Sequence, residues 1–249
     1  MKQTNRFSKL LFALGASAFL FSCNNSSNET STKTDTTKMD TTAVTPPPTS
    51  TAPAGPAVPF DVAIIYHSVK DYAAWRPGFD TDSTARRASG LGDIVVGKKV
   101  GKPNDVEIVL MASDIAKAKA FAADPRLKDV MQKNGVTSKP EIDYWHVIRF
   151  DAKNDASSST WAEVTHKVKD FDTWVKAFDA EASMRPGFGL ADAVLARGID
   201  DPNLVYIVFA VTDMDKAKAR MASPELKKIM MDAGVVGAPK VAFYSDASK

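Results

Sequence analysis

Two histidines, His67 and His166, are the side chains best suited to chemistry near neutral pH, because imidazole can exchange a proton or bind a metal there. The third histidine, His146, has Ser245 at the matched position of the chain, so the pair falls short of a metal-ligand set. Cys23 is the only cysteine, which excludes an intrachain disulfide and a zinc thiolate cluster. We therefore expect no metal and no cofactor.

The spacing of the histidines belongs to a longer repeat. They are separated by 166 − 67 = 99 positions, and Trp75 and Trp174 have the same offset. A comparison of positions 62–145 with 161–244 gives about 31 identities in about 84 positions without a gap. Two like modules in one chain predict that the modules pack together as the two subunits of a symmetric dimer would.

Each module has the pattern β-α-β-β-α-β. In the first module, runs rich in β-branched and aromatic residues at 63–69, 94–100, 106–112 and 142–150 are typical of strands. Asp71 is placed to cap a helix that ends near Gly90, and Asp114 to cap a second. Pro77 lies inside the first of these, so we expect that helix to be kinked or to start late. The second module has the same capping aspartates 99 positions later, at Asp170 and Asp213. The order is the ferredoxin-like split βαβ arrangement, so the predicted fold class is α+β.

The chain resembles the dimeric α/β-barrel superfamily, which includes the antibiotic-biosynthesis-monooxygenase-like and stress-responsive groups. The resemblance rests on the segments 67–75 and 166–174, which begin His-Ser-Val-Lys-Asp-Tyr and His-Lys-Val-Lys-Asp-Phe and end in tryptophan. It covers nearly all of residues 61–246. It implies two ferredoxin-like modules that pair their sheets around a central cavity as an intrachain pseudo-dimeric barrel, so that the dimer interface is satisfied within the chain. The superfamily hosts oxygenases, isomerases, cyclases and haem enzymes, so the resemblance implies a fold and no single activity.

Strand parity sorts the candidate site residues, because successive side chains of a strand point to opposite faces of the sheet. His67 and His166 share their face with apolar residues, and we expect that face to lie under the helices. We expect the opposite, mixed face to line the barrel cavity. The candidate ligand-binding residues on that face are Tyr66, Glu107, Asp143, Trp145, Glu163, Thr165, Tyr206 and Tyr244.

His67, His166, Arg86 and Arg185 are second-choice site residues. For the histidines, packing with a hydrogen bond in a core is favoured over a catalytic role. The arginines recur late in the first helix of each module. They could interact with the helix dipole, form a salt bridge across elements, or bind an anion.

The N-terminus is typical of a bacterial lipoprotein signal. Lys2, Arg6 and Lys9 precede an apolar run over residues 10–21, which is too short to span a bilayer, and Cys23 follows this run in a segment that resembles a lipobox. We expect Cys23 to be acylated and to anchor the protein to a membrane of the bacterial cell envelope; the alternative is a cleaved secretory signal with an incidental cysteine. The asparagine after the cysteine favours the outer membrane over the inner.

Loss of the signal removes three positive charges, so the net charge of the mature chain is +2 − 3 = −1. This balance gives no strongly basic face, and we expect no nucleic-acid partner. Residues 24–59 are almost all Asn, Ser, Thr, Pro, Ala and short charged groups, a composition that predicts a disordered tether. The predicted organisation is a signal peptide at 1–22, the tether at 23–60, the first module at 61–150, a linker at 151–159 and the second module at 160–249.

Three functions are compatible with this sequence. The first is a lipid-anchored protein whose barrel binds a small, partly apolar molecule, indicated by the aromatic and acidic side chains of the predicted cavity. The second, implied by the resemblance, is a cofactor-independent oxygenase- or cyclase-like enzyme. The third is a structural or interaction module with no ligand.

Overall fold

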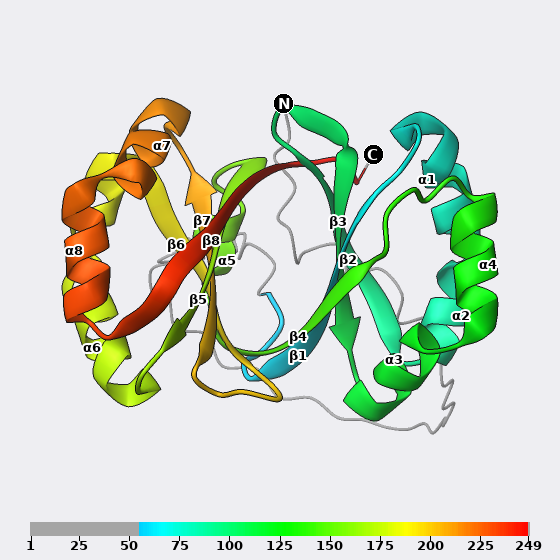
Figure 1. The fold of residues 1–249 in the computed structure, drawn as a ribbon, viewed down its shortest axis with the longest axis horizontal. Coiled ribbons are helices and arrows are strands. Elements are labelled where there is room, and N and C mark those ends of the chain that lie inside the picture. Colours follow the sequence, from blue (N-terminus) through cyan, green and yellow to red (C-terminus); the bar gives the residue numbers. More distant parts are fainter. Residues whose placement is uncertain (1–54, 249) are drawn as a thin grey trace, which may run out of the picture.

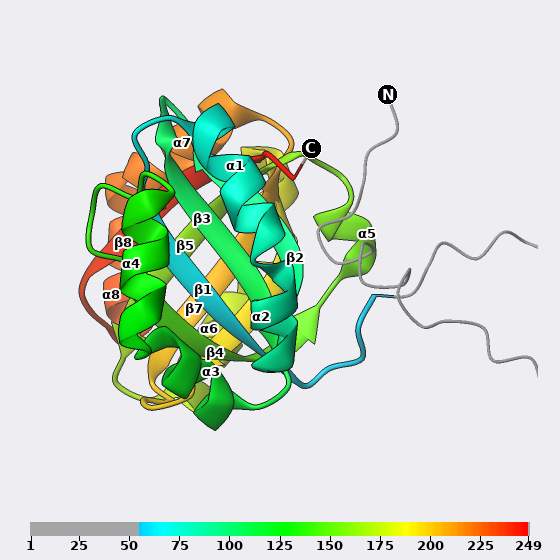
Figure 2. The same ribbon diagram turned by 90° about the vertical axis from the view of Figure 1, so that its right-hand side faces the viewer.

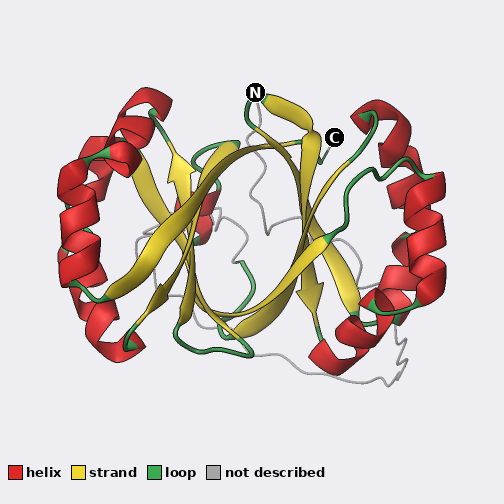
Figure 3. Ribbon diagram, in the orientation of Figure 1, coloured by secondary structure: helices red, strands yellow, loops and turns green. Residues whose placement is uncertain are grey.

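Eight antiparallel strands close into one barrel in the computed structural model, which describes residues 55–248. The order around the barrel is β1-β3-β2-β8-β5-β7-β6-β4, and β4 pairs with β1 to close it. Figure 3 shows the strands as a central layer between two layers of helices. The strands are β1 (Phe60–Ser68), β2 (Leu91–Lys99), β3 (Lys102–Ala112), β4 (Glu141–Phe150), β5 (Thr160–Val168), β6 (Leu190–Gly198), β7 (Leu204–Val211) and β8 (Val235–Asp246).

Each half of the barrel is one ferredoxin-like sheet. The first module gives the order β4-β1-β3-β2 and the second gives β8-β5-β7-β6. Two seams join the halves: β4 pairs with β6, and the end of β2 pairs with the end of β8. The predicted fold class is therefore confirmed, and the chain is an intrachain pseudo-dimeric α/β barrel.

Helices cover the outer face of each sheet, at opposite sides of the barrel (Figure 1). In Figure 2 the helices of the first module lie across the strands of their own sheet. Aspartate side chains cap α1, α3, α6 and α7 by accepting a backbone N–H, as the sequence predicts. The first module contains α1 (Tyr72–Thr81), α2 (Ser83–Ala88), α3 (Ile115–Ala122) and α4 (Pro125–Lys133); the second contains α6 (Phe171–Ala180), the 3-10 helix η2 (Arg185–Phe188), α7 (Met214–Ala222) and α8 (Pro224–Asp232).

The first helical segment of module one differs from the prediction, because it is two helices and not one. Asp82 separates α1 from α2, with φ −77° and ψ 2°. The hydroxyl of Thr81 donates to the carbonyl of Pro77 at 2.9 Å, and such bonds back to the preceding turn often bend helices. The break places Asp82 at a corner of the helical layer.

The two faces of the barrel wall carry different cores. The lumen holds one cluster drawn from both modules, including Ile64, Trp145, Trp161 and Tyr206. Two further clusters lie between each sheet and its own helices, around Trp75 in module one and around Trp174 in module two. The parity assignment from sequence is therefore confirmed.

Some predicted features fall at or beyond the ends of the described chain. The signal peptide, Cys23 and the predicted tether up to residue 54 lie outside the described residues. The segment predicted as a linker contains a short helix, α5 (Ala152–Asp155). Within residues 55–248, no helix has the length and apolar character needed to cross a membrane.

Candidate functional site

Glu163 is the centre of a buried polar network in the barrel lumen. Its side chain is only 4% exposed and lies on β5. The hydroxyl of Tyr206 donates to Glu163 Oε1 at 2.6 Å, and the hydroxyl of Tyr66 donates to Oε2 at 3.1 Å. Burial and the nearby Glu163 charge raise the pKa of Tyr66 well above its usual value, so Tyr66 stays a neutral donor.

A second carboxylate shares this network. Glu107 is 0% exposed, and Trp161 Nε1 donates to Glu107 Oε2 at 3.0 Å and to Glu163 Oε1 at 3.3 Å. The indole of Trp161 fits because Gly97 on β2 has no side chain: a Cβ there would lie 2.6 Å from Trp161 Cζ2. The lumen therefore brings together two acids, two tyrosines and a tryptophan from both modules.

The other four residues predicted to face the lumen differ in how deeply they are buried. Trp145 is fully buried and stacks on Tyr206 with ring centroids 5.1 Å apart. Tyr244 stacks on Trp161 at 6.2 Å. Thr165 is half-buried and Asp143 is exposed, so these two stand apart from the acid–tyrosine network. A ligand-binding role for the lumen residues stays a prediction.

His67 and His166 lie on the outer face of the barrel, beneath the helices of their own modules. Each ring meets a tryptophan edge to face, His67 on Trp75 at 5.6 Å and His166 on Trp174 at 5.3 Å. Within residues 55–248, neither ring nitrogen of either histidine has a hydrogen-bond partner. Burial lowers the pKa of both histidines from 6.5 to about 4, so both rings are neutral at pH 7. The expected packing is observed, but the expected hydrogen bond is not.

The two arginines form salt bridges across elements, one of the three interpretations left open by the sequence. Arg86 binds Asp93 on β2 through two bonds of 2.8 and 3.0 Å, and it also donates to the carbonyl of Phe79 at 2.7 Å. Arg185 binds Asp192 in the same way. Each guanidinium group is thereby bound by one carboxylate and one backbone carbonyl of its own module.

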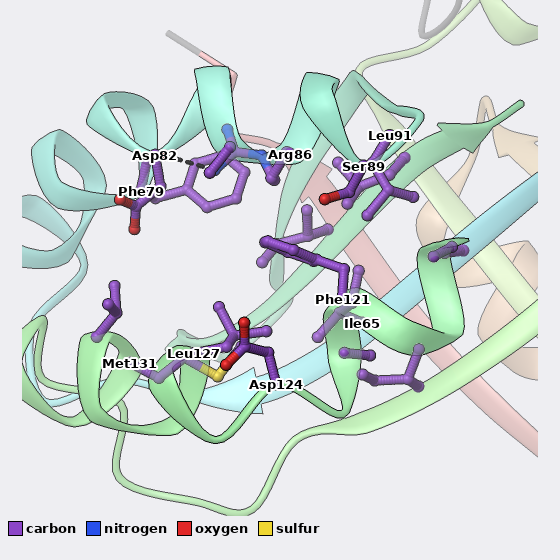
Figure 4. A pocket seen from close by; sticks show the side chains of 18 of the residues that line it. Ile65, Phe79, Asp82, Arg86, Ser89, Leu91, Phe121, Asp124, Leu127 and Met131 are labelled. Carbon is purple, nitrogen blue, oxygen red and sulfur yellow. Dashed lines mark hydrogen bonds between the residues drawn. The ribbon is translucent and has the colours of Figure 1, made fainter. Parts of the chain in front are cut away.

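A large cavity opens on the helix side of module one, away from the lumen. It has a volume of about 770 Å³ and lies between the outer face of the sheet, α1–α2 and α3–α4. Figure 4 shows Phe121 projecting into it, with Phe79 and Asp82 on one wall and Leu127 and Met131 on the other. His67 and Trp75 also line it.

The matched cavity of module two has a volume of only about 80 Å³. Three matched positions contribute to the difference, because module two has the larger side chain at each. Leu110 corresponds to Phe209, Ala122 to Met221 and Ser89 to Phe188 at the offset of 99. The order of strands and long helices is the same in both modules, but module one has α2 where module two has the 3-10 helix η2, so the helices as well as the side chains set how much space remains.

These cavity-lining residues were not among the site residues predicted from the sequence. The prediction placed the ligand cavity in the lumen, whereas the two cavities of about 770 and 80 Å³ lie on the helix sides. The repeat itself held the signal, since the size differences at the three matched positions can be read from the aligned modules. Among residues 55–248, no group of three or more His, Cys, Asp or Glu side chains is placed to hold a metal ion.

Comparison with known proteins supports the assignment of the fold. No family model and no curated protein matches the chain. The structure of an anthrone oxidase-like protein aligns with 76% of this chain and 92% of its own, at 12% identity and a TM-score of 0.51. The fold is that of the dimeric α/β barrels.

Two further solved structures have lower scores. A haem-binding protein from Thermus thermophilus covers 76% of this chain and 92% of its own, at 13% identity and a TM-score of 0.47. A ferredoxin-fold protein from Listeria monocytogenes, related to antibiotic-biosynthesis monooxygenases, covers 77% and 97%, at 11% identity and a TM-score of 0.42. Identities this low concern the fold and carry no activity to this barrel.

Proposed function

We propose that the module-one cavity binds a small, largely apolar molecule. The observation that carries the proposal is the contrast between about 770 Å³ in module one and about 80 Å³ in module two. In module two the same order of elements is filled by its own side chains, so the ferredoxin-like fold alone does not impose the space in module one. Aromatic and aliphatic side chains with a few polar groups are the usual lining of a ligand site.

The experiment is a fluorescence titration with 1-pyrenemethanol, an apolar probe with one hydroxyl. We expect one binding site per chain. The double substitution Leu110→Phe/Ala122→Met gives module one the larger residues of module two, so binding should fall at least tenfold while the fold is kept. Met221→Ala, at the matched position in module two, should leave binding in module one unchanged. Wild-type affinity in the double variant would overturn the proposal.

A specific feature of His67 favours a second candidate function, an oxygenase-like reaction at the same cavity. His67 lines the large cavity, and both its ring nitrogens lack a partner among the described residues, so a nitrogen lone pair is free to accept a proton. Burial lowers its pKa to about 4, which keeps the ring neutral at pH 7 but makes it a weaker base than an exposed histidine. A neutral imidazole in an apolar site can accept a proton from a carbon acid, and the resulting carbanion can be oxidised by O₂. The anthrone oxidase-like neighbour makes this chemistry a suitable first assay.

The assay measures oxygen uptake with anthrone. Oxidation of its CH₂ group to a carbonyl consumes one O₂ and releases one water, giving anthraquinone. We expect uptake above the uncatalysed rate, and about a hundredfold loss in His67→Gln, which removes the base. His166→Gln is the matched control in module two and should keep the rate. Uptake that is unaffected by His67→Gln, or absent in the wild type, would reject the enzymatic candidate.

We also propose that acylated Cys23 holds the barrel near a bacterial envelope membrane. The basic start, the short apolar run and the single cysteine at its end support this location. Cys23→Ser should move the protein from the membrane fraction to the soluble fraction or leave an uncleaved precursor. Normal processing with unchanged fractionation would exclude the anchor.

A further inference from the structure

Asp82 is a charged side chain at the edge of the module-one cavity. It lines the cavity at the break between α1 and α2. It precedes α2 as the N-cap residue, but its side chain makes no capping hydrogen bond. No salt bridge or hydrogen bond from its carboxylate occurs within residues 55–248. The carboxylate in Figure 4 lies on the wall that faces Asp124 and Leu127.

Module two shows what this position does when it has a partner. Glu181 stands 99 positions after Asp82, and its Oε2 accepts from Arg220 Nη2 at 3.1 Å. Arg220 is only 6% exposed, and its guanidinium lies 4.3 Å from the centre of the Phe188 ring. Glu225 accepts from the same guanidinium at 3.2 Å. The small cavity of module two therefore contains a built-in cation, held by acids and an aromatic ring.

Module one retains the acid and has lost that cation. The residue matched to Arg220 is Phe121, whose ring projects into the cavity. Arg126 occupies the position of Glu225, but it is turned to Asp124, with which it forms a 2.6 Å ion pair. No arginine or lysine of the described chain takes the place of the module-two guanidinium beside Asp82.

The other charges around the cavity have partners. Arg86 is bound to Asp93 at 2.8 Å, and Lys117 lies 3.8 Å from Asp114. Asp82 is thus the one charged lining residue without an ion-pair partner among the described residues. His67 is 6% exposed, lines the same cavity and has no hydrogen-bond partner within the described chain. His166 also lacks a partner there, but it lines the cavity of about 80 Å³, so only the ring of module one has room beside it for a ligand.

We infer that the ligand of the module-one cavity is an organic cation, with an apolar body and an amine or guanidine group that pairs with Asp82. The inference rests on the proposed binding function. The apolar body lies against the aromatic and aliphatic lining, and the cation takes the role that the Arg220 guanidinium has in module two. The neutral ring of His67 offers a hydrogen bond to a polar group deeper in the cavity.

The test compares three probes with the same apolar body: 1-pyrenemethylamine, 1-pyrenemethanol and 1-pyrenecarboxylic acid. At pH 7 we expect the amine to bind about tenfold more tightly than the alcohol, and the acid more weakly than either. Asp82→Asn should remove the preference for the amine and keep the affinity for the alcohol. Asp80→Asn is the control, since Asp80 lies two residues before Asp82, on α1, and pairs with Arg76.

A second variant tests the comparison between modules. Phe121→Arg gives Asp82 the internal cation that Glu181 has in module two, so the amine should lose more affinity than the alcohol. Equal binding of the amine and the acid, or an amine preference that survives Asp82→Asn, would overturn the inference while leaving the binding function in place. Failure of all three probes to bind would overturn the proposed function and this inference with it.

Discussion

Trp161 connects the two buried acids of the lumen through a single N–H group. Its Nε1 lies 3.0 Å from Glu107 Oε2 and 3.3 Å from Glu163 Oε1. Buried carboxylates are costly unless hydrogen-bond donors satisfy them, so the position of the indole is tightly constrained. Gly97 is the residue that leaves room for it, because Trp161 Cζ2 lies where a Cβ would point.

We predict that Gly97→Ala lowers the free energy of unfolding by about 2 kcal/mol, because the new methyl group overpacks the lumen against Trp161 and Glu107. Urea unfolding followed by tryptophan fluorescence measures this. Gly92→Ala is the control on the same strand, since a Cβ there would meet only Met111 Cβ at an ordinary 3.8 Å. Equal stability of the two variants would show that the indole is not confined as described.

The two buried histidines make stability depend on pH. Burial lowers their pKa from 6.5 to about 4 in the folded protein. Between these values the unfolded chain binds the proton and the folded chain does not, so stability falls as pH falls from about 6.5 to about 4. The loss between pH 7 and pH 5 is about 2 kcal/mol per histidine.

The double variant His67→Phe/His166→Phe should remove this dependence. Urea unfolding at pH 7 and pH 5 should show that the variant loses about 4 kcal/mol less than the wild type. His146 is present in both proteins and pairs with Asp61, so its contribution cancels. The same pH dependence in both proteins would mean that the buried rings do not carry the effect.

At the residue scale, the sequence predicted which face each side chain occupies, because alternation along a strand is local. It did not predict that Glu163 would gather Tyr66, Tyr206 and Trp161, since that depends on how distant strands are registered across the lumen. The exposure of Asp143, which lies on the predicted lumen face, is also a consequence of its place near the beginning of β4. The missing hydrogen bonds of His67 and His166 depend on what packs against the rings, which no local pattern specifies.

Helix α1 holds the C-terminal segment at the β2–β8 seam. This seam has three residue pairs, whereas the β4–β6 seam has five. The hydroxyl of Tyr72 donates to the carbonyl of Ala247, and Arg76 donates to the same carbonyl at 2.8 Å and to that of Ser248 at 3.3 Å. Ala247 in turn donates to Val96 of β2 at 2.8 Å. The short seam is thus extended by side-chain contacts.

We predict that Arg76→Val, which gives α1 the residue found at the matched position of α6, loosens the C-terminal segment. The loss of two hydrogen bonds should cost about 1 kcal/mol and speed hydrogen exchange at the Ala247 amide. Asp80→Asn removes the salt-bridge partner of Arg76 but leaves its contacts with Tyr72 and the C-terminal segment, so it should keep slow exchange. Fast exchange in the wild type would contradict the role given to α1.

At the element scale, the helix caps could be predicted, because a capping aspartate accepts the N–H of the residue three positions later, and that is a local pattern in the sequence. Pro77 predicted a kink or a late start in the first helix of module one, but it did not predict that the helix would begin at Tyr72 and break at Asp82. The open cavity was missed because its volume depends on the fit of α3 and α4 against the sheet. Only a comparison of the two modules reveals that fit from sequence.

The whole molecule is one barrel made by two modules that bury each other's sheet faces. Ile64 and Trp145 from module one share the lumen with Trp161 and Tyr206 from module two. The offset of 99 predicted the two like modules from the sequence, whereas closure of the barrel came from the family resemblance. The sequence of one module does not predict that the barrel closes, since the strands of an open sheet and of a closed barrel have the same alternation of side chains.

We predict that residues 60–150 alone cannot remain a folded monomer, because the lumen face of the sheet would be exposed to water. Light scattering after gel filtration should find a homodimer, or the fragment should be insoluble. A soluble monomer that unfolds cooperatively would refute the view that the two modules depend on one another.

The central claim is that the ligand site is the helix-side cavity of module one and not the lumen. A crystal structure of the protein soaked with 1-bromopyrene tests this most directly, because the anomalous signal of bromine locates the probe. We predict the bromine between α1–α2 and α3–α4, near Phe121 and Trp75. Bromine in the lumen beside Glu163, or in the small cavity of module two, would contradict the account.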